Sequence, residues 1–284
     1  MMNIKTMVAQ AMVTVTLGMP SSALGQTFYG PTHYYQASDS PFFEMSGLEI
    51  EDAEDGVFNL PGASSNHPRM GSSFAYGSVD SVDVDDGSIN GTCIDGESFW
   101  GSGSITITFG VGGADLPHHA GLVWTDGFGN VTFEAWGPGN VSLGQVDGGN
   151  HSNGYGNWWG STSEDRFYGV SHLAGIEKIT VSNPGGIEID HVQQVVMTPV
   201  ELILHILDEL FDDGTLNNGQ YTSLLNKLNH ALSKIDSGQL TAGCNQLNAF
   251  ILQVDALVTD GILTANEGQT LVDAATSISE AAGC

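Results

Sequence analysis

Positive charge is almost missing from this sequence of 284 residues, which has 6 lysines and arginines against 33 aspartates and glutamates. The formal net charge of −27 argues against nucleic acid or anionic lipid as a partner, because both attract basic surfaces. An acidic surplus of this size suits an exported protein in saline or calcium-rich water. There, screening ions or bound divalent cations relieve the repulsion between carboxylates.

Long apolar runs are also missing, so the sequence predicts no membrane-spanning helix. The most apolar stretch, residues 7–19, follows a short segment with one positive charge and precedes small residues at Ala23 and Gly25. This pattern is typical of a secretory signal peptide. We therefore expect residues 1–25 to be removed before Gln26 and the mature protein to be secreted. An amphipathic first helix is the alternative, but no polar face develops in this stretch.

Signatures of catalysis are missing as well. No G-x-S-x-G elbow is present, the histidines before residue 197 are scattered, and Cys93 has no signature of a nucleophile. Glu134 and Glu164 could form the carboxylate pair of a glycoside hydrolase, but the sequence does not give their separation. We therefore expect no enzymatic activity, with a glycoside hydrolase as one alternative.

A change of composition near residue 197 divides the remaining chain in two. Residues 26–196 hold 29 of the 38 glycines and all five tryptophans. Residues 103–110 alternate between apolar and polar types, which is typical of a half-buried strand. Two hairpins are predicted, with strands at 120–124, 131–136, 175–182 and 187–195. Short strands at this spacing predict an all-β domain of two packed sheets.

From Met197 onward, apolar residues recur every three or four positions, as on one face of an amphipathic helix. Thr198 to Glu201 has the spacing of a capping box, with proline at the first helical position. Glycine-containing turns separate four such segments, at 213–214, 237–238 and 260–261. We predict that residues 197–284 form a small all-α four-helix bundle.

The helical region resembles the FIMAH-type domains at the C-termini of secreted bacterial proteins. The resemblance rests on residues 223–231, Gly238 and residues 244–254. Such domains accompany many unrelated extracellular proteins. The resemblance therefore implies a secreted, modular protein, and it implies no particular substrate.

Three groups of acidic residues are candidates for a metal site. Glu49 and Glu51 project from one face of a predicted strand, and Glu188 and Asp190 repeat this alternation in a later strand. The third group is a loop with four carboxylates: Asp80, Asp83, Asp85 and Asp86. Clustered oxygen ligands suit Ca²⁺, whereas Zn²⁺ would need histidine and cysteine. The alternative is solvated charge that keeps sheet edges from aggregating.

The first two acidic groups carry a resemblance to galactose-binding-like jelly rolls, which include family-six carbohydrate-binding modules. In those folds an early Glu-rich strand and an Asp in the last strand share a structural Ca²⁺. Segments 48–52 and 187–190 match this arrangement in kind and in position. The resemblance covers residues 45–195 and implies a jelly-roll sandwich with a role in carbohydrate binding. It also implies a calcium ion shared by Glu49, Glu51, Glu188 and Asp190.

One segment places three aromatic rings among glycine and asparagine residues, where core packing is least expected to require them. Sugar rings stack on flat aromatic faces while amides and carboxylates read their hydroxyl groups. We predict that these rings bind a glycan: Tyr155, Trp158 and Trp159. The alternative is that one of the two adjacent tryptophans is buried. The other tryptophans lie in strand-like runs and are predicted to be core: Trp100, Trp124 and Trp136.

Three cysteines allow one disulfide, and an exported protein can keep it. Cys244 lies near the start of the third predicted helix and Cys284 follows the fourth. Adjacent helices joined by a short loop run antiparallel, which brings these two positions together. We predict a Cys244–Cys284 disulfide with Cys93 free, and three free thiols are the alternative.

Together these features predict a secreted, non-catalytic protein whose sandwich recognises an extracellular glycan or polymer, with Ca²⁺ as structural support. The first alternative is a structural or cell-surface assembly protein whose sandwich packs against copies of itself. The second is the glycoside hydrolase already mentioned. The sequence does not say which glycan would be bound.

Overall fold

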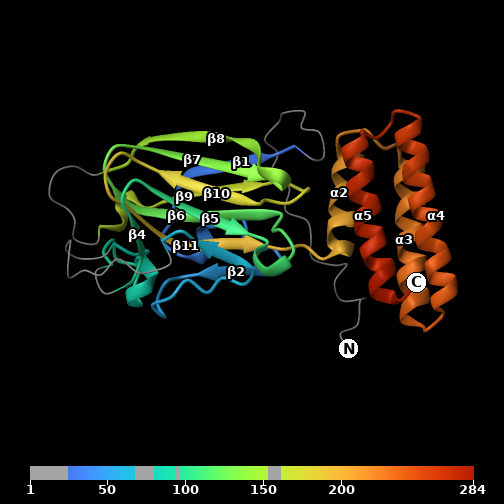
Figure 1. The fold of residues 1–284 in the computed structure, drawn as a ribbon, viewed down its shortest axis with the longest axis horizontal. Helices are drawn as coiled ribbons and strands as arrows, with labels where there is room; N and C mark the ends of the chain where they lie inside the picture. The colour runs from blue at the N-terminus through green and yellow to red at the C-terminus, as the bar shows by residue number, and fades with distance from the viewer. Residues whose placement is uncertain (1–24, 68–79, 94–95, 153–160) are drawn as a thin grey trace.

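A computed structural model describes residues 25–67, 80–93, 96–152 and 161–284 of the chain. Two antiparallel β-sheets pack face to face, and four helices follow them at one end of the sandwich (Figure 1). The prediction of an all-β sandwich followed by an all-α bundle is confirmed. Residues 1–24, which carry most of the predicted signal peptide, lie outside the described part of the chain.

The strands fall into two sheets. The first sheet has the order β1 (Thr27–His33), β9 (Arg166–Ser171), β6 (His119–Gly127), β11 (Ile187–Val195) and β2 (Leu48–Glu51), with β4 (Phe99–Gly101) also paired to β11. The second sheet has the order β3 (Ala63–Ser65), β5 (Ser104–Phe109), β10 (Lys178–Ser182), β7 (Asn130–Gly137) and β8 (Val141–Asn150).

The strand order is that of a jelly roll. From β5 onward, consecutive strands alternate between the two sheets, except that the β7–β8 hairpin stays within the second sheet. The four strands β2-β11-β6-β9 therefore face the four strands β5-β10-β7-β8, as two interlocked Greek keys do. The jelly-roll topology expected from the sequence is confirmed.

Alternation along the strands builds the core between the sheets. In β5, Ile105, Ile107 and Phe109 are buried while the threonines between them are half-buried, because successive side chains point to opposite faces. The first sheet is buried on both faces. Tyr34, Phe42 and other residues of the connecting loops form a second apolar cluster on its outer side. These loops bring distant acidic residues onto the first sheet.

The four helices are α2 (Pro199–Asp212), α3 (Asn218–Asp236), α4 (Leu240–Thr259) and α5 (Ala265–Ala282). The predicted capping box is present, since the Thr198 side chain accepts from the Glu201 backbone N–H and the Glu201 carboxylate accepts from the Thr198 N–H. The predicted disulfide is confirmed too: Cys244 and Cys284 are bonded, with their Cα atoms 5.7 Å apart. Cys93 is buried and free.

The helices and the sandwich share a packed junction. Leu173 of the sandwich belongs to the apolar cluster of the helices. The Met197 N–H donates to His118 Nδ1 over 3.1 Å, and the rings of His119 and His205 have centroids 6.5 Å apart. None of the helices in the described part of the chain is long and apolar enough to cross a membrane.

Candidate cation site at the loop end of the sandwich

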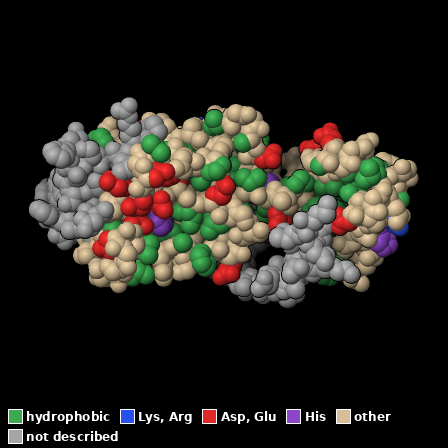
Figure 2. All heavy atoms as spheres, turned by 90° about the horizontal axis from the view of Figure 1, so that it is seen from below, with side chains coloured by type: hydrophobic (Ala, Val, Ile, Leu, Met, Phe, Trp, Pro, Cys, Tyr) green, Lys and Arg blue, Asp and Glu red, His purple; other side chains and the backbone are tan. Residues whose placement is uncertain are grey.

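Acidic side chains, most of them buried, gather at the end of the sandwich that lies away from the helices. Figure 2 shows further, exposed acidic side chains on the surface of this part of the sandwich. The gathered side chains come from the loop before β4, from the end of β6, from the turn before β9 and from β11. The residues are Asp80, Asp83, Asp85, Asp126, Glu164, Asp165, Glu188 and Asp190. Segments far apart in the sequence therefore supply one acidic region.

Strand β11 holds the acidic loop in place through its own carboxylates. Glu188 Oε2 accepts from the Asp80 N–H over 2.8 Å, and Asp190 Oδ2 accepts from the Val82 N–H over 3.2 Å. Glu188 also lies directly opposite Asp126 in the pairing of β11 with β6. Backbone amides and strand register thus bring three separate carboxylates next to Asp80.

The short turn before β9 joins this region from another side. The Thr162 N–H donates to the Gly91 carbonyl oxygen over 3.4 Å, and Thr92 pairs with Ser161 in an isolated β-bridge. The Arg166 guanidinium donates to the backbone carbonyl oxygen of Asp165 over 2.8 Å. The guanidinium therefore binds the main chain of Asp165 and forms no hydrogen bond with its carboxylate.

Two buried aspartates have no hydrogen-bond partner for either carboxylate oxygen. Asp80 is 1% exposed and Asp165 is 0% exposed, and all four of their carboxylate oxygens lack a partner, as does the buried Thr162 hydroxyl. Burying a polar group without a partner costs about 1–3 kcal/mol, and an unpaired buried charge costs more. In the described part of the sandwich, these two aspartates are the buried side chains with the most polar atoms that lack a hydrogen-bond partner.

Burial and mutual repulsion perturb these groups strongly. Burial, with the charges of Asp126 and Glu188 next in importance, raises the pKa of Asp80 to about 10. Burial and then the charge of Asp80 raise the pKa of Asp165 well above its ordinary value. Burial also raises the pKa of Glu188 to about 7. A divalent cation would relieve both the desolvation and the repulsion.

A separate network lies beside these two residues. Asp85, Asp190 and His191 place one ligand atom each within 4.8 Å of one another. Their polar atoms are already used, because His191 Nε2 is 3.1 Å from Asp85 Oδ1 and the Ser81 hydroxyl contacts both carboxylates at 2.7 and 2.8 Å. The Tyr34 hydroxyl lies 2.9 Å from His191 Nδ1. The network is complete without an ion.

The pKa of His191 follows from this network. Burial disfavours the charged imidazolium, but the carboxylates of Asp190 and Asp85 outweigh burial and raise its pKa above the ordinary value. His191 also has a φ of 41°, a left-handed conformation that is uncommon for residues other than glycine. The pairing of β11 with β6 shifts register between Asp190 and Gln193. A bulge in β11 thus turns the imidazole toward Asp85.

The structure separates the first predicted metal group from the second. In the pairing of β2 with β11, Glu49 lies opposite Gln194 and Glu51 lies opposite Val192. Glu49 Oε2 accepts from Gln194 Nε2 over 2.7 Å, and Glu51 accepts from the backbone of the turn that follows β2. Glu188, in contrast, contacts the acidic loop. The register therefore joins the second and third predicted groups and leaves the first in local hydrogen bonds.

Two members of the third group close turns. Asp83 accepts from the backbone N–H groups of Asn90 and Gly91, and Asp86, which is exposed, accepts from Ser88. Asp80 and Asp85 point into the acidic region instead. The sequence did not predict Asp126 and Asp165 as members of the site, because neither belongs to one of the acidic clusters that suggested a metal. Only the fold of the loops brings them together.

The predicted aromatic site falls on Tyr155, Trp158 and Trp159, which lie outside the described residues. The described chain before them ends with β8, and the chain after them resumes at Ser161, next to the acidic region. Of the tryptophans predicted to be core, Trp124 is fully buried. Trp100 and Trp136 are half-buried, and the Lys178 ammonium lies 4.0 Å from the ring centre of Trp136.

The carboxylates of the alternative hydrolase lie in different parts of the fold. Glu134 is in the middle of β7 in the second sheet, opposite Thr180 and Gln145. Glu164 is buried in the turn before β9, which belongs to the first sheet. Strand register does not bring these two groups together.

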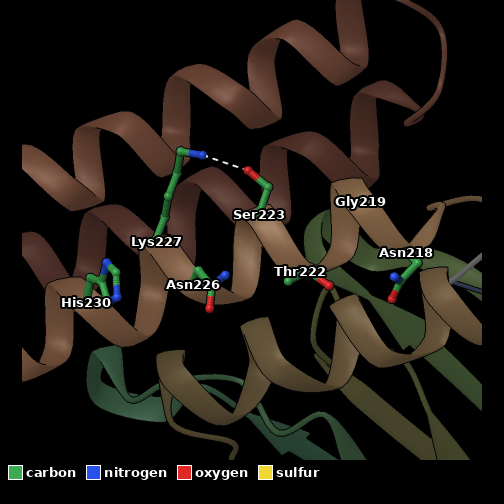
Figure 3. Close-up of a pocket in the computed structure, with 7 residues that line it drawn as sticks. All are labelled: Asn218, Gly219, Thr222, Ser223, Asn226, Lys227 and His230. Carbon is green, nitrogen blue, oxygen red and sulfur yellow. Dashed lines mark hydrogen bonds between the residues drawn. The ribbon is translucent and has the colours of Figure 1, made fainter.

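A shallow depression of about 490 Å³ lies on the helical part, along α3. Figure 3 shows its polar side chains spaced along that helix. Its lining residues are Asn218, Gly219, Thr222, Ser223, Asn226, Lys227 and His230. The Lys227 ammonium is occupied by the Ser223 hydroxyl and by Gln253. The depression is open and gathers no group with unmet hydrogen bonds, so the loop end of the sandwich is the better candidate.

Comparison with known proteins adds no relative. No family model matches the sequence, and no curated protein matches it.

Proposed function

We propose that this protein is a secreted, non-catalytic recognition protein whose jelly-roll sandwich binds an extracellular glycan or related polymer at its loop end, with Ca²⁺ as structural support. The observation that carries this proposal is the pair of buried, unpartnered carboxylates at that end. They favour a region organised by a bound cation over an acidic surface that only solvates the protein.

Two features support secretion. The disulfide between Cys244 and Cys284 suits an oxidising compartment. The sequence begins with a segment typical of a signal peptide, and its charge of −27 suits a saline or calcium-rich medium.

Two features support the recognition of a polymer at the loop end. Jelly rolls bind ligands through loops carried on a rigid sandwich. The segment with Tyr155, Trp158 and Trp159 connects β8 to the turn before β9, and that turn belongs to the acidic region. Aromatic rings, amides and carboxylates are the side chains that sugar recognition needs.

A binding experiment tests this proposal. The secreted chain is applied to a glycan array and to insoluble polysaccharides, in CaCl₂ and in EDTA. Replacing Trp158 and Trp159 together by Ala should abolish retention, because the stacking faces are lost. Phe128→Ala is the matched control, since Phe128 is a 62% exposed aromatic in the turn between β6 and β7. Retention of the double variant at the parent level would contradict the proposed binding face.

The assembly alternative is favoured by one observation. Strand β8 lies at the edge of the second sheet, is ten residues long and exposes Val141 by 62%. Edges of this kind can pair with a second copy. Light scattering with and without Ca²⁺ distinguishes the two functions: growth of mass without binding to any polysaccharide would favour assembly.

A further inference from the structure

Among the buried acids that the structure describes, Asp80 and Asp165 differ in that neither oxygen of their carboxylates has a hydrogen-bond partner. Asp190 accepts from Ser81, Val82 and His191, and Asp85 from Ser81 and His191. Asp80 and Asp165 are at least as deeply buried, yet none of their carboxylate oxygens has a partner. The carboxylates of Asp85 and Asp190 therefore have hydrogen-bond partners, whereas those of Asp80 and Asp165 have none.

The open pair is close together in the fold. Among charged groups, Asp80 has the largest electrostatic effect on Asp165. Asp80 is fixed by its own backbone N–H on Glu188. Asp165 follows the turn whose Thr162 N–H donates to the carbonyl oxygen of Gly91, in the same loop as Asp80. Backbone contacts on both sides therefore hold the two carboxylates in the same region.

Protonation alone does not satisfy these residues. A protonated aspartate has a hydroxyl group that must itself donate to an acceptor. No hydrogen bond joins the carboxyl group of Asp80 to that of Asp165, or either carboxyl group to another group, so a bound proton would also lack a partner. A cation between the carboxylates would instead use all the open oxygens, since Ca²⁺ binds oxygens at about 2.3–2.6 Å and accepts six to eight of them.

The available donors select a hard cation. The open atoms are carboxylate oxygens and the unpartnered hydroxyl of Thr162. The nearby imidazole of His191 has both ring nitrogens engaged, by Tyr34 and Asp85, so a zinc ligand set is not offered. The donors come from separate segments of the chain, and Ca²⁺ accepts a more variable ligand geometry than Mg²⁺ does.

We infer that Asp80 and Asp165, with the Thr162 hydroxyl, bind one Ca²⁺ ion that ties the loop after β3 to the start of β9. This inference rests on the calcium part of the proposed function. It joins Asp80, which the sequence predicted as a ligand, to Asp165 and Thr162, which it did not. Ser161 and Thr162 directly follow the segment with the predicted glycan-binding rings. The ion fixes the point at which that segment rejoins the sandwich.

The test is a calcium titration of the mature chain after treatment with a chelator and dialysis, with no glycan present. Isothermal titration calorimetry with CaCl₂ should give one ion per chain. At a hundredfold excess of Ca²⁺ over the dissociation constant, the melting temperature should rise by about 5–10 °C, because the ion binds only the folded state. Absence of both binding heat and a melting shift in the parent chain would overturn the inference.

Two single variants locate the ion. Asp165→Asn should lose the calcium-induced shift. Its melting temperature in EDTA should be close to that of the parent, because the variant replaces a buried carboxyl group whose oxygens have no partner by a neutral side chain of similar shape. Asp80→Asn should behave in the same way and serves where Asp165→Asn is poorly folded, as circular dichroism would reveal. A calcium shift that persists in both variants would overturn the inference.

Two controls separate this site from its neighbours. Asp86→Asn changes an exposed acid of the same loop, which accepts only from Ser88, and it should keep the full shift. Glu49→Gln combined with Glu51→Gln should keep the shift as well. If this double variant loses the shift while Asp165→Asn keeps it, the ion binds where the resemblance to carbohydrate-binding jelly rolls placed it. Because the titration contains no glycan, a failure of polysaccharide binding alone leaves the ion site standing.

Discussion

At the scale of single residues, the acidic end of the sandwich contains two ways of burying a carboxylate. Asp190 is bound by a serine hydroxyl and two backbone amides, whereas Asp80 and Asp165 have no bound group. Buried charges are normally paired or bound to metals. The contrast within one small region is what distinguishes a hydrogen-bond network from a cation site.

The network predicts a large effect for His191. His191→Ala should lower the free energy of unfolding by about 3 kcal/mol, because Asp85 and the Tyr34 hydroxyl each lose one of their buried partners and keep only Ser81 and Gln193. His191→Asn should lose about 1 kcal/mol less, since asparagine tolerates the left-handed backbone at this position. Urea unfolding at fixed calcium concentration measures both. Equal midpoints for the parent and His191→Ala would contradict the role assigned to the network.

At the scale of elements, the disulfide joins the start of α4 to the residue that follows α5. It closes a loop across a sequence separation of 40 residues. Replacing Cys244 and Cys284 together by Ser should therefore lower the free energy of unfolding by about 4 kcal/mol in the loop-entropy model. Chemical denaturation of the double variant measures this effect, with Cys93→Ser as the control that keeps the bond.

Thiol counting provides the complementary check on the same element. The parent chain, denatured without reductant, should show one reactive thiol, which belongs to Cys93. Three reactive thiols, or a peptide map that joins Cys93 to either of the other cysteines, would contradict the pairing.

Local patterns predicted the four helices and about half of the strands. Period-two alternation marked β5, a three-to-four period marked the helices, and Thr198 to Glu201 marked the start of α2. They did not mark the strands β1, β3, β4, β8 and β9. These signals depend on neighbours within a few residues. The pairing of elements depends on contacts between distant segments, and the sequence indicated it only where a short turn or a shared helix end constrained it.

At the scale of the whole molecule, the candidate site was the part that local patterns could not fix. Glu188 and Asp190 were correctly recognised as acids on one strand, but the register of β11 places Glu188 opposite Trp100 and Asp126 rather than opposite Glu51. The positions of the other acids depend on the bulge after Asp190 and on the loop that packs against the outer side of the first sheet. No periodic pattern in the sequence marks Asp165, which became a candidate ligand only because the fold buries it.

The junction between the sandwich and the helices buries histidines, whereas the loop end buries acids. His118 and His119 are buried there, beside His205 of α2. Burial lowers the pKa of His118 to about 4, and burial together with the charges of His205 and His118 lowers the pKa of His119 to about 3. His119 Nδ1 is hydrogen-bonded to Ser171, and its Nε2 has no partner. The folded state therefore holds both imidazoles neutral.

This junction predicts a loss of stability in mild acid. Because the pKa of His119 in the folded state lies below the unfolded value near 6.5, the unfolded chain binds the proton first as the pH falls. The stabilisation is complete above pH 6.5 and decreases until the folded pKa is reached. For His119 alone the decrease between pH 7 and pH 5 is about 2 kcal/mol.

Protonation of the acids at the loop end changes stability in the same pH range, so the comparison must be made between variants. His119→Asn keeps a polar atom near Ser171 and cannot titrate, so the difference in unfolding free energy between it and the parent should shrink or reverse from pH 7 to pH 5. His230→Asn, on the exposed face of α3, should follow the parent at every pH. A constant difference between His119→Asn and the parent across this range would show that burial at the junction does not control the titration of His119.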